Sequence, residues 1–189
     1  MRLYITATVV VLGLLSLAGA FTFEKVISHT SSTEFCISCH EMRDNVYEEY
    51  KKTSHFNNAS GVSPTCSDCH VPKGLFPTLY RKLIAAKDVY HHLLGTIDTP
   101  EKFEEHRLSM AKRVWEQMEA SDSVECRSCH DFKNMNFEKQ RKRAAKQHQN
   151  AIRDGDTCID CHKGIAHKAV HKNLNDETVD ENMELELGF

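Results

Sequence analysis

All eight cysteines and four of the twelve histidines in this chain of 189 residues belong to one five-residue unit, Cys-x-x-Cys-His, which occurs four times. The four units contain Cys36, Cys39 and His40; Cys66, Cys69 and His70; Cys126, Cys129 and His130; and Cys158, Cys161 and His162. This unit is the attachment signature of c-type haem. Two thiols add covalently to the haem vinyl groups, and the adjacent histidine reaches the iron. The spacing therefore predicts four covalently bound c-type haems.

Closely paired cysteines also occur in other kinds of site, and each of these is an alternative to the haem interpretation. Tetrathiolate zinc sites, iron–sulfur sites and disulfides also employ closely spaced cysteines. Zinc and iron–sulfur sites have no need of a histidine after every second cysteine, and disulfides between such near neighbours would close only very small loops. The haem interpretation alone accounts for the histidines.

Four haem irons take up to eight axial ligands, and the repeated units offer four. His55 precedes the second unit at nearly the same distance as His148 precedes the fourth, and His167 follows His162 closely. We predict these three histidines as distal ligands. The first haem then lacks a partner, and Met42 offers either a thioether ligand, which raises a haem potential, or an ordinary apolar contact. A surface role is expected for the other histidines: His29, His91, His92, His106 and His171.

The two halves of the chain resemble each other. Asp68-Cys69-His70 in the first half corresponds to Asp160-Cys161-His162 in the second, and each is soon followed by Lys-Gly. Such internal similarity predicts a duplicated two-haem module. The expected fold is mostly α: an N-terminal transmembrane helix and a compact helical multihaem domain built from two duplicated dihaem modules.

Two helices are expected between the halves. Apolar residues recur at helical spacing from Leu79 to Leu93, and Gly95 with Asp98 ends the pattern. Thr99 and Pro100 then form a typical helix start, with a capping threonine followed by proline. The second helix carries an apolar stripe of its own, formed by Leu108, Ala111, Trp115 and Met118. Both stripes are expected to pack on haem faces or on each other.

The N-terminal segment predicts a membrane anchor. Residues 3–23 contain no charged side chain, and about 20 such residues cross a bilayer as a helix. Ala18-Gly19-Ala20 looks like a signal-peptidase site, but the apolar run continues to Phe23, which favours an uncleaved anchor over residues 1–25. Arg2 favours a cytoplasmic N-terminus. The tetrahaem domain, residues 26–172, would then lie in the periplasm of a bacterium, where c-type haem is attached.

The amino-acid composition further limits the expected partners and the expected makeup of the core. The formal charge is −3 and no basic face is interleaved with aromatic residues, so nucleic acid is not an expected partner. Aromatic residues make up only 8% of the chain, and four porphyrins would supply much of the apolar volume of the core. Residues 173–189 form an acidic tail that we expect to be solvated and disordered.

Several of these motifs together resemble the NapC/NirT/NrfH family of membrane-anchored tetrahaem cytochromes c. The resemblance is carried by Cys39-His40-Glu41-Met42, Asp68-Cys69-His70-Val-Pro, Gly95-Thr-Ile-Asp98-Thr and Thr157-Cys158-Ile-Asp-Cys161-His162-Lys-Gly-Ile-Ala-His167. It implies a protein of the bacterial inner membrane that oxidises quinol from the membrane pool. The electrons would pass to a periplasmic terminal reductase, such as one for nitrate or nitrite.

The resemblance also implies roles for single residues. It makes the first haem a high-spin centre with Met42 on one side, and it pairs His167 with the second haem, His55 with the third and His148 with the fourth. Some relatives carry a histidine where this chain has Lys73, which leaves the far side of the first haem open.

For the quinol site, the resemblance points to Lys82 and Asp88. Lys82 would bind a quinol oxygen, and Asp88 would accept a proton. The helical period sets these two side chains about 120° apart, so they can act together only if the helix bends or the ring lies between them. One alternative is an electron relay between two proteins without a quinol site. Another is a haem-based sensor that uses the open first haem.

Overall fold

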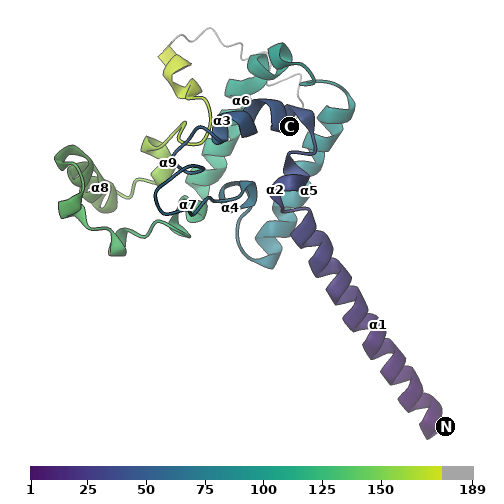
Figure 1. The fold of residues 1–189 in the computed structure, drawn as a ribbon. Helices are drawn as coiled ribbons and strands as arrows, with labels where there is room; N and C mark the ends of the chain where they lie inside the picture. The colour runs from purple at the N-terminus through teal and green to yellow at the C-terminus, as the bar shows by residue number, and fades with distance from the viewer. Residues whose placement is uncertain (176–189) are drawn as a thin grey trace.

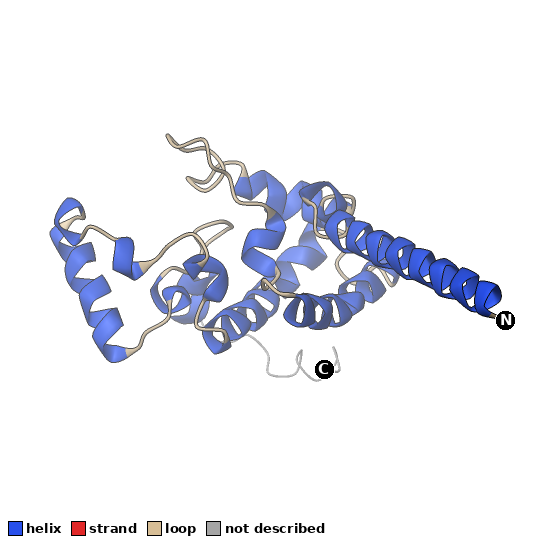
Figure 2. Cartoon of the chain, turned by 90° about the horizontal axis from the view of Figure 1, so that it is seen from below, coloured by secondary structure: helices blue, strands red, loops and turns tan. Residues whose placement is uncertain are grey.

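The computed structural model describes residues 1–175, and every regular element in that range is a helix. One long helix projects from a body of shorter helices (Figure 1, and from below in Figure 2). This confirms the expected mostly α fold with an N-terminal apolar helix. Most of the acidic tail predicted over residues 173–189 lies outside the described residues.

Helix α1 (Arg2–His29) is the projecting element, and the rest of the protein covers none of its apolar window. Its 28 residues extend about 42 Å at the α-helical rise, more than the roughly 30 Å of a bilayer core. Within the helix, hydroxyl groups donate back to carbonyls of the preceding turn, as Ser16 Oγ does to the Leu12 carbonyl at 2.8 Å. The helix is therefore long and apolar enough to cross a membrane, and it continues four residues beyond the predicted anchor.

The four haem-attachment units lie on or beside four short helices: α2 (Thr33–Cys36), α4 (Cys66–His70), α7 (Val124–Arg127) and α9 (Cys158–Cys161). A helical turn brings residues three apart onto one face, so each pair of thiols can reach one haem. Thr65 and Thr157 form capping boxes with Asp68 and Asp160. The aspartates that relate the two halves thus have the same local role, which is to fix the helix start.

Helices α5 (Leu75–Leu93) and α6 (Pro100–Ala120) connect the halves. Thr99 caps α6 as predicted, with its side chain accepting from Lys102 N at 3.3 Å. Helix α5 begins at Leu75, four residues before the predicted start, because Pro77 falls in the first turn, where its missing N–H costs nothing. The turn after α5 closes when Lys102 Nζ donates to the Gly95 carbonyl at 2.9 Å and to Asp98 Oδ1 at 2.7 Å.

The remaining elements surround the attachment units. They are a π-helix η1 (Met42–Tyr47), α3 (Glu48–Tyr50), the 3-10 helices η2 (Phe132–Asn134), η3 (Phe137–Lys139) and η4 (Val170–Asn175), and α8 (Lys142–Asp154). Helix α8 ends at Gly155 in the left-handed conformation, with φ 80°, a common helix terminus for glycine.

Few side chains form a protein-only core. Among the described residues the buried apolar side chains are Tyr50, Phe103, Ile159 and Val170. On α5, Leu83, Tyr90 and Leu93 are not covered by other protein side chains, and packing of this stripe on a haem face stays a prediction. The short helices are joined to one another by hydrogen bonds and ion pairs, as between Arg107 and Glu49. The four haems would supply much of the remaining apolar volume of the core.

Candidate haem sites

The four attachment units follow one another through the body in sequence order. Helix α2 packs on α4, and α4 packs on α7. The thiols of Cys36 and Cys66 lie close enough for each to shift the pKa of the other, raising that of Cys36 and lowering that of Cys66, which places the first unit beside the second. Cys69 and Cys129 lie close enough for the charge of one to affect the other. Each of the first three units therefore lies beside the next.

The third and fourth units are joined in the same way. Cys126 and Cys158 interact electrostatically, and the Ile159 amide of α9 donates to Ser123 Oγ at 3.2 Å. Ser123 is fully buried and has a left-handed backbone conformation, with φ 49°. This unusual conformation places its hydroxyl where it can hold α7 against α9.

At the second unit, His70 faces His167. Their rings are stacked, with centroids 6.2 Å apart and planes inclined by 25°. Two imidazoles that bind one metal from opposite sides, each through a bond of about 2 Å, have centroids roughly 6 Å apart. Burial lowers the pKa of His70 to about 4 and also lowers the pKa of His167. Both rings therefore favour the neutral form that ligates a metal.

At the fourth unit, His162 faces His148 of α8. The centroids are 5.9 Å apart and the planes are inclined by 27°. Burial lowers the pKa of His162, and Gln140 Oε1 lies 2.7 Å from His148 Nδ1. The amide oxygen accepts from Nδ1–H, which leaves the other ring nitrogen of His148 available to a metal.

At the third unit, His130 faces His55 from the first half of the chain. The centroids are 6.2 Å apart and the rings are nearly perpendicular, at 84°. Tyr50 holds the chain beside His55, since its hydroxyl donates to the His55 carbonyl at 3.4 Å and also contacts the Pro64 carbonyl. The structure thus brings together all three pairs that the family resemblance implies, and their assignment to irons stays a prediction.

At the first unit, His40 faces a residue that sequence reasoning placed on the surface. The centroids of His40 and His92 are 5.8 Å apart, with planes inclined by 61°. Met42 is partly buried in the first turn of η1, and its role as a ligand stays a prediction. Sequence reasoning did not relate His92 to His40, because His92 lies on α5, outside both repeated modules.

Lys82 and Asp88 point to different neighbours. Lys82 Nζ donates to Thr30 Oγ1 at 2.8 Å, next to the end of α1, and burial lowers the pKa of Lys82. Its charge also acts on Cys36. Asp88 is exposed by its surface area, yet desolvation by the protein around it raises the pKa of its carboxyl, and the charges of Arg81 and Arg113 lower that pKa. The structure places Lys82 beside the first unit and does not bring the two side chains together.

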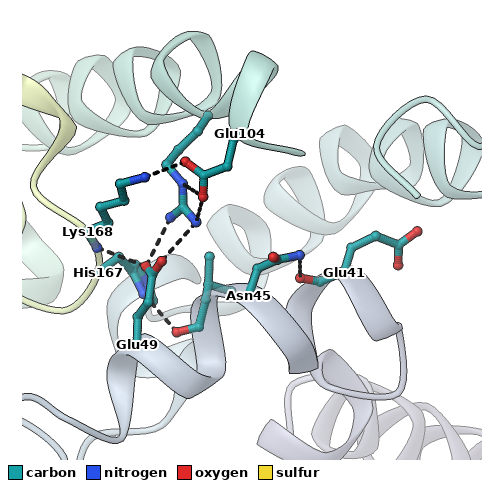
Figure 3. A network of polar contacts seen from close by, with 8 residues as sticks. Glu41, Asn45, Glu49, Glu104, His167 and Lys168 are labelled. Atoms are coloured by element: carbon teal, nitrogen blue, oxygen red, sulfur yellow. Dashed lines mark hydrogen bonds and ion pairs between the residues drawn. The ribbon is translucent and has the colours of Figure 1, made fainter. Parts of the chain in front are cut away.

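A network of polar contacts holds the segment that contains His167 and Lys168 (Figure 3). Arg107 is 7% exposed and binds both oxygens of Glu49, at 3.0 and 2.9 Å. It also contacts Glu104 Oε1 at 2.6 Å. Glu49 Oε2 accepts from the Lys168 amide at 2.9 Å, and Lys168 Nζ pairs with Glu104 at 2.7 Å. Helices α3 and α6 thereby hold the segment that carries His167.

Four adjoining Cys-x-x-Cys-His units on short helices, each faced by a further histidine at the distance that one iron spans, define a multihaem c-type cytochrome. The comparisons agree with this class. The sequence model of the NapC/NirT cytochrome c family, N-terminal region, matches residues 1–172. The chain belongs to this family, its cofactors are four c-type haems, and it is an electron-transfer protein.

Individual relatives are similar over most of the chain. It is 53% identical over 146 residues to the cytochrome c-type protein NapC of Escherichia coli strain K12, which covers 77% of this chain and 73% of the relative. It is 56% identical over 141 residues to a putative tetraheme cytochrome-c type protein of Allochromatium vinosum, covering 75% and 76%. It is 52% identical over 145 residues to the denitrification system component NirT of Stutzerimonas stutzeri, covering 77% and 72%. No solved structure matches the chain.

Proposed function

We propose that this cytochrome oxidises quinol in the bacterial inner membrane and passes the electrons to a periplasmic terminal reductase. The order of the haem units relative to the membrane helix carries this proposal. The end of α1 meets α2 and α5, whereas α8 lies at the opposite end of the body in both views (Figures 1 and 2). The first unit is thus nearest the anchor, and the later units extend away from it.

The orientation follows from the N-terminus and from the cofactor. Arg2 precedes the apolar run and supports a cytoplasmic N-terminus, with the haem body in the periplasm, where c-type haem is attached. One relative is described as a denitrification system component. This description favours a reductase of nitrogen oxides as the partner that receives the electrons.

Lys82 is the group best placed to bind quinol. Its ammonium lies between the membrane end of α1, through Thr30, and the first haem unit, through Cys36. A lysine ammonium is a compact cationic donor that can hold a quinol oxygen. A quinol ring that enters from the bilayer would reach Lys82 before any later unit.

Asp88 is the proposed proton acceptor, and because the structure does not bring it to Lys82, the quinol ring would have to lie between the two side chains. Oxidation of one quinol breaks two O–H bonds, releases two protons and sends two electrons, one at a time, to the haems, which supply the electron-accepting chemistry when bound. A carboxylate with a raised pKa is a better base than an ordinary aspartate, and the protein around Asp88 raises its pKa. The second proton would leave through water at the exposed side of α5.

The proposal is tested by mixing the oxidised holoprotein in detergent, without oxygen, with a reduced menaquinol analogue while haem absorbance is followed. We expect rapid reduction of the wild type and slow reduction of Lys82→Ala. Lys142→Ala is the matched control, since Lys142 is an exposed lysine at the start of α8, and it should reduce as fast as the wild type.

Two results would overturn the proposal in different ways. Failure of the wild type to accept electrons from quinol, together with reduction by a protein donor, would establish the relay function instead. Equal rates for Lys82→Ala and the wild type would retain quinol oxidation and move the site away from Lys82.

A further inference from the structure

We propose that His92 is an axial ligand of the first haem iron, on the side of the haem opposite to His40. The two rings are 5.8 Å apart between centroids. The three other facing pairs in this body are 5.9 to 6.2 Å apart. The first unit therefore has a partner at the same separation, and His92 supplies it.

Helix α5 is placed to deliver this ligand because it runs along the first unit. Near its middle, the charge of Lys82 acts on Cys36. Near its end, the ligand atoms of His92, Cys39 and Glu41 lie within 4.8 Å of one another. A haem that is tethered at Cys36 and Cys39 would thus have α5 beside it, with His92 at the Cys39 end.

Glu41 holds the ring of His92. Its side chain is only 2% exposed, and its Oε1 lies 2.6 Å from His92 Nδ1 and 3.6 Å from His40 Nε2. A carboxylate on one ring nitrogen is the usual outer contact of a ligating histidine and leaves the other nitrogen for the metal.

Met42 does not compete with His92 for the same side of the haem. It follows His40 by two residues, and both belong to the segment that is tethered through Cys39. A short segment on one face of a porphyrin cannot also reach the other face. Met42 is thus an alternative to His40 on the near side, whereas His92 comes from α5 on the far side.

The inference gives the first haem two strong-field nitrogen ligands and therefore a low-spin iron. The family resemblance instead implies a high-spin first haem. Spin state distinguishes the two without any measurement of activity, and it can be read on the wild-type protein alone. The ligation of the first haem does not depend on quinol oxidation, so it can be tested separately from the proposed function.

The experiment is electron paramagnetic resonance and near-infrared magnetic circular dichroism of the full-length, oxidised holoprotein in detergent. We expect the wild type to show four low-spin haems with bis-histidine ligation and no high-spin ferric signal. In His92→Ala we expect one haem of the four to become high-spin, and added imidazole should return it to low spin. In His92→Met we expect one low-spin haem with a histidine–methionine signature.

The matched control is His29→Ala, because His29 is an exposed histidine that lies beside Phe35 of α2 and close to the same unit. Its spectrum should equal that of the wild type. Haem content per chain is measured for each variant, so that loss of a haem is separated from loss of a ligand. The proposal is overturned if the wild type already contains one high-spin haem. It is also overturned if His92→Ala retains four haems with an unchanged spectrum.

Discussion

The imidazole of His167 donates its Nδ1–H to the backbone carbonyl of Val46, at 3.1 Å, across 121 positions of sequence. This bond leaves Nε2 of His167 for the second haem and so fixes the tautomer that a ligand needs. His55 makes the reverse exchange, since it comes from the first half and faces His130 of the second half. With the predicted iron ligands, the two halves of the chain would therefore complete each other's haem sites.

Removal of the carboxylate of Glu49 should destabilise this junction. Glu49→Gln leaves the nearly buried guanidinium of Arg107 with Glu104 alone, and loss of one partner from a buried ion pair costs about 3 kcal/mol. We expect a lower unfolding midpoint in thermal or denaturant unfolding of the holoprotein. Arg153→Ala is the control, because its pair with Asp154 is exposed, and it should unfold as the wild type does. Equal midpoints for the two variants would refute a structural role of the network.

Loss of one attachment unit should remove one haem and leave the other three. The double substitution Cys158→Ala and Cys161→Ala removes both thioether bonds of the fourth unit. We expect intact-protein mass spectrometry to show a decrease of one haem per chain. A chain that still carries four covalent haems would contradict the attachment sites assigned to these cysteines.

Substitution of Met42 distinguishes whether His40 or Met42 binds the first iron on the side of the attachment segment. Because the ring of His40 is the one that faces His92, we expect Met42→Leu to leave the spectrum and the potential of the first haem almost unchanged. Redox titration with optical detection measures this. A clear decrease of one potential would assign the near side to the Met42 thioether, since thioether ligands raise haem potentials.

Asp88→Asn should have opposite effects on stability and on electron uptake. The folded protein raises the pKa of Asp88 above its ordinary 3.8, so the native state holds this proton more tightly than the unfolded chain does. The resulting stability is present at pH values below the ordinary pKa and is lost as the pH rises through the raised pKa.

Asn keeps the side chain neutral at every pH, so the wild type should lose stability relative to Asp88→Asn as the pH rises from 4 toward neutrality. Denaturant unfolding at several pH values measures this difference. Asp88→Asn should also slow reduction by quinol, since amides do not accept the proton. A difference in stability that is independent of pH would show that Asp88 is not the titrating group.

Local patterns in the sequence predicted much of this structure. Thr99 and Pro100 were predicted to begin a helix and do so, and the apolar N-terminal run forms one helix. The four attachment units were recognisable because covalent chemistry requires fixed spacing. The sequence did not show which neighbour covers the apolar stripe of α5, because periodicity identifies an apolar face and not its neighbour.

Tertiary contacts were beyond the reach of the sequence alone. Arg107 meets Glu49 across 58 positions, and no periodic pattern relates them. His92 was assigned to the surface because it lies outside the repeated modules, although α5 brings it within 2.6 Å of Glu41. No local sequence pattern identifies a histidine that contacts a residue far away in the chain, because the fold determines that contact.

The interlocked pairs also bear on how the protein matures. A chain is made from its N-terminus, so His70 and the second attachment unit are complete long before His167 is synthesised. Until that last segment docks between α3 and α6, the second haem would have one protein ligand, and His55 would wait for a third unit that does not yet exist. Haem insertion at the early units should therefore precede docking of the C-terminal segment, which would close the earlier sites from outside as a final step of assembly.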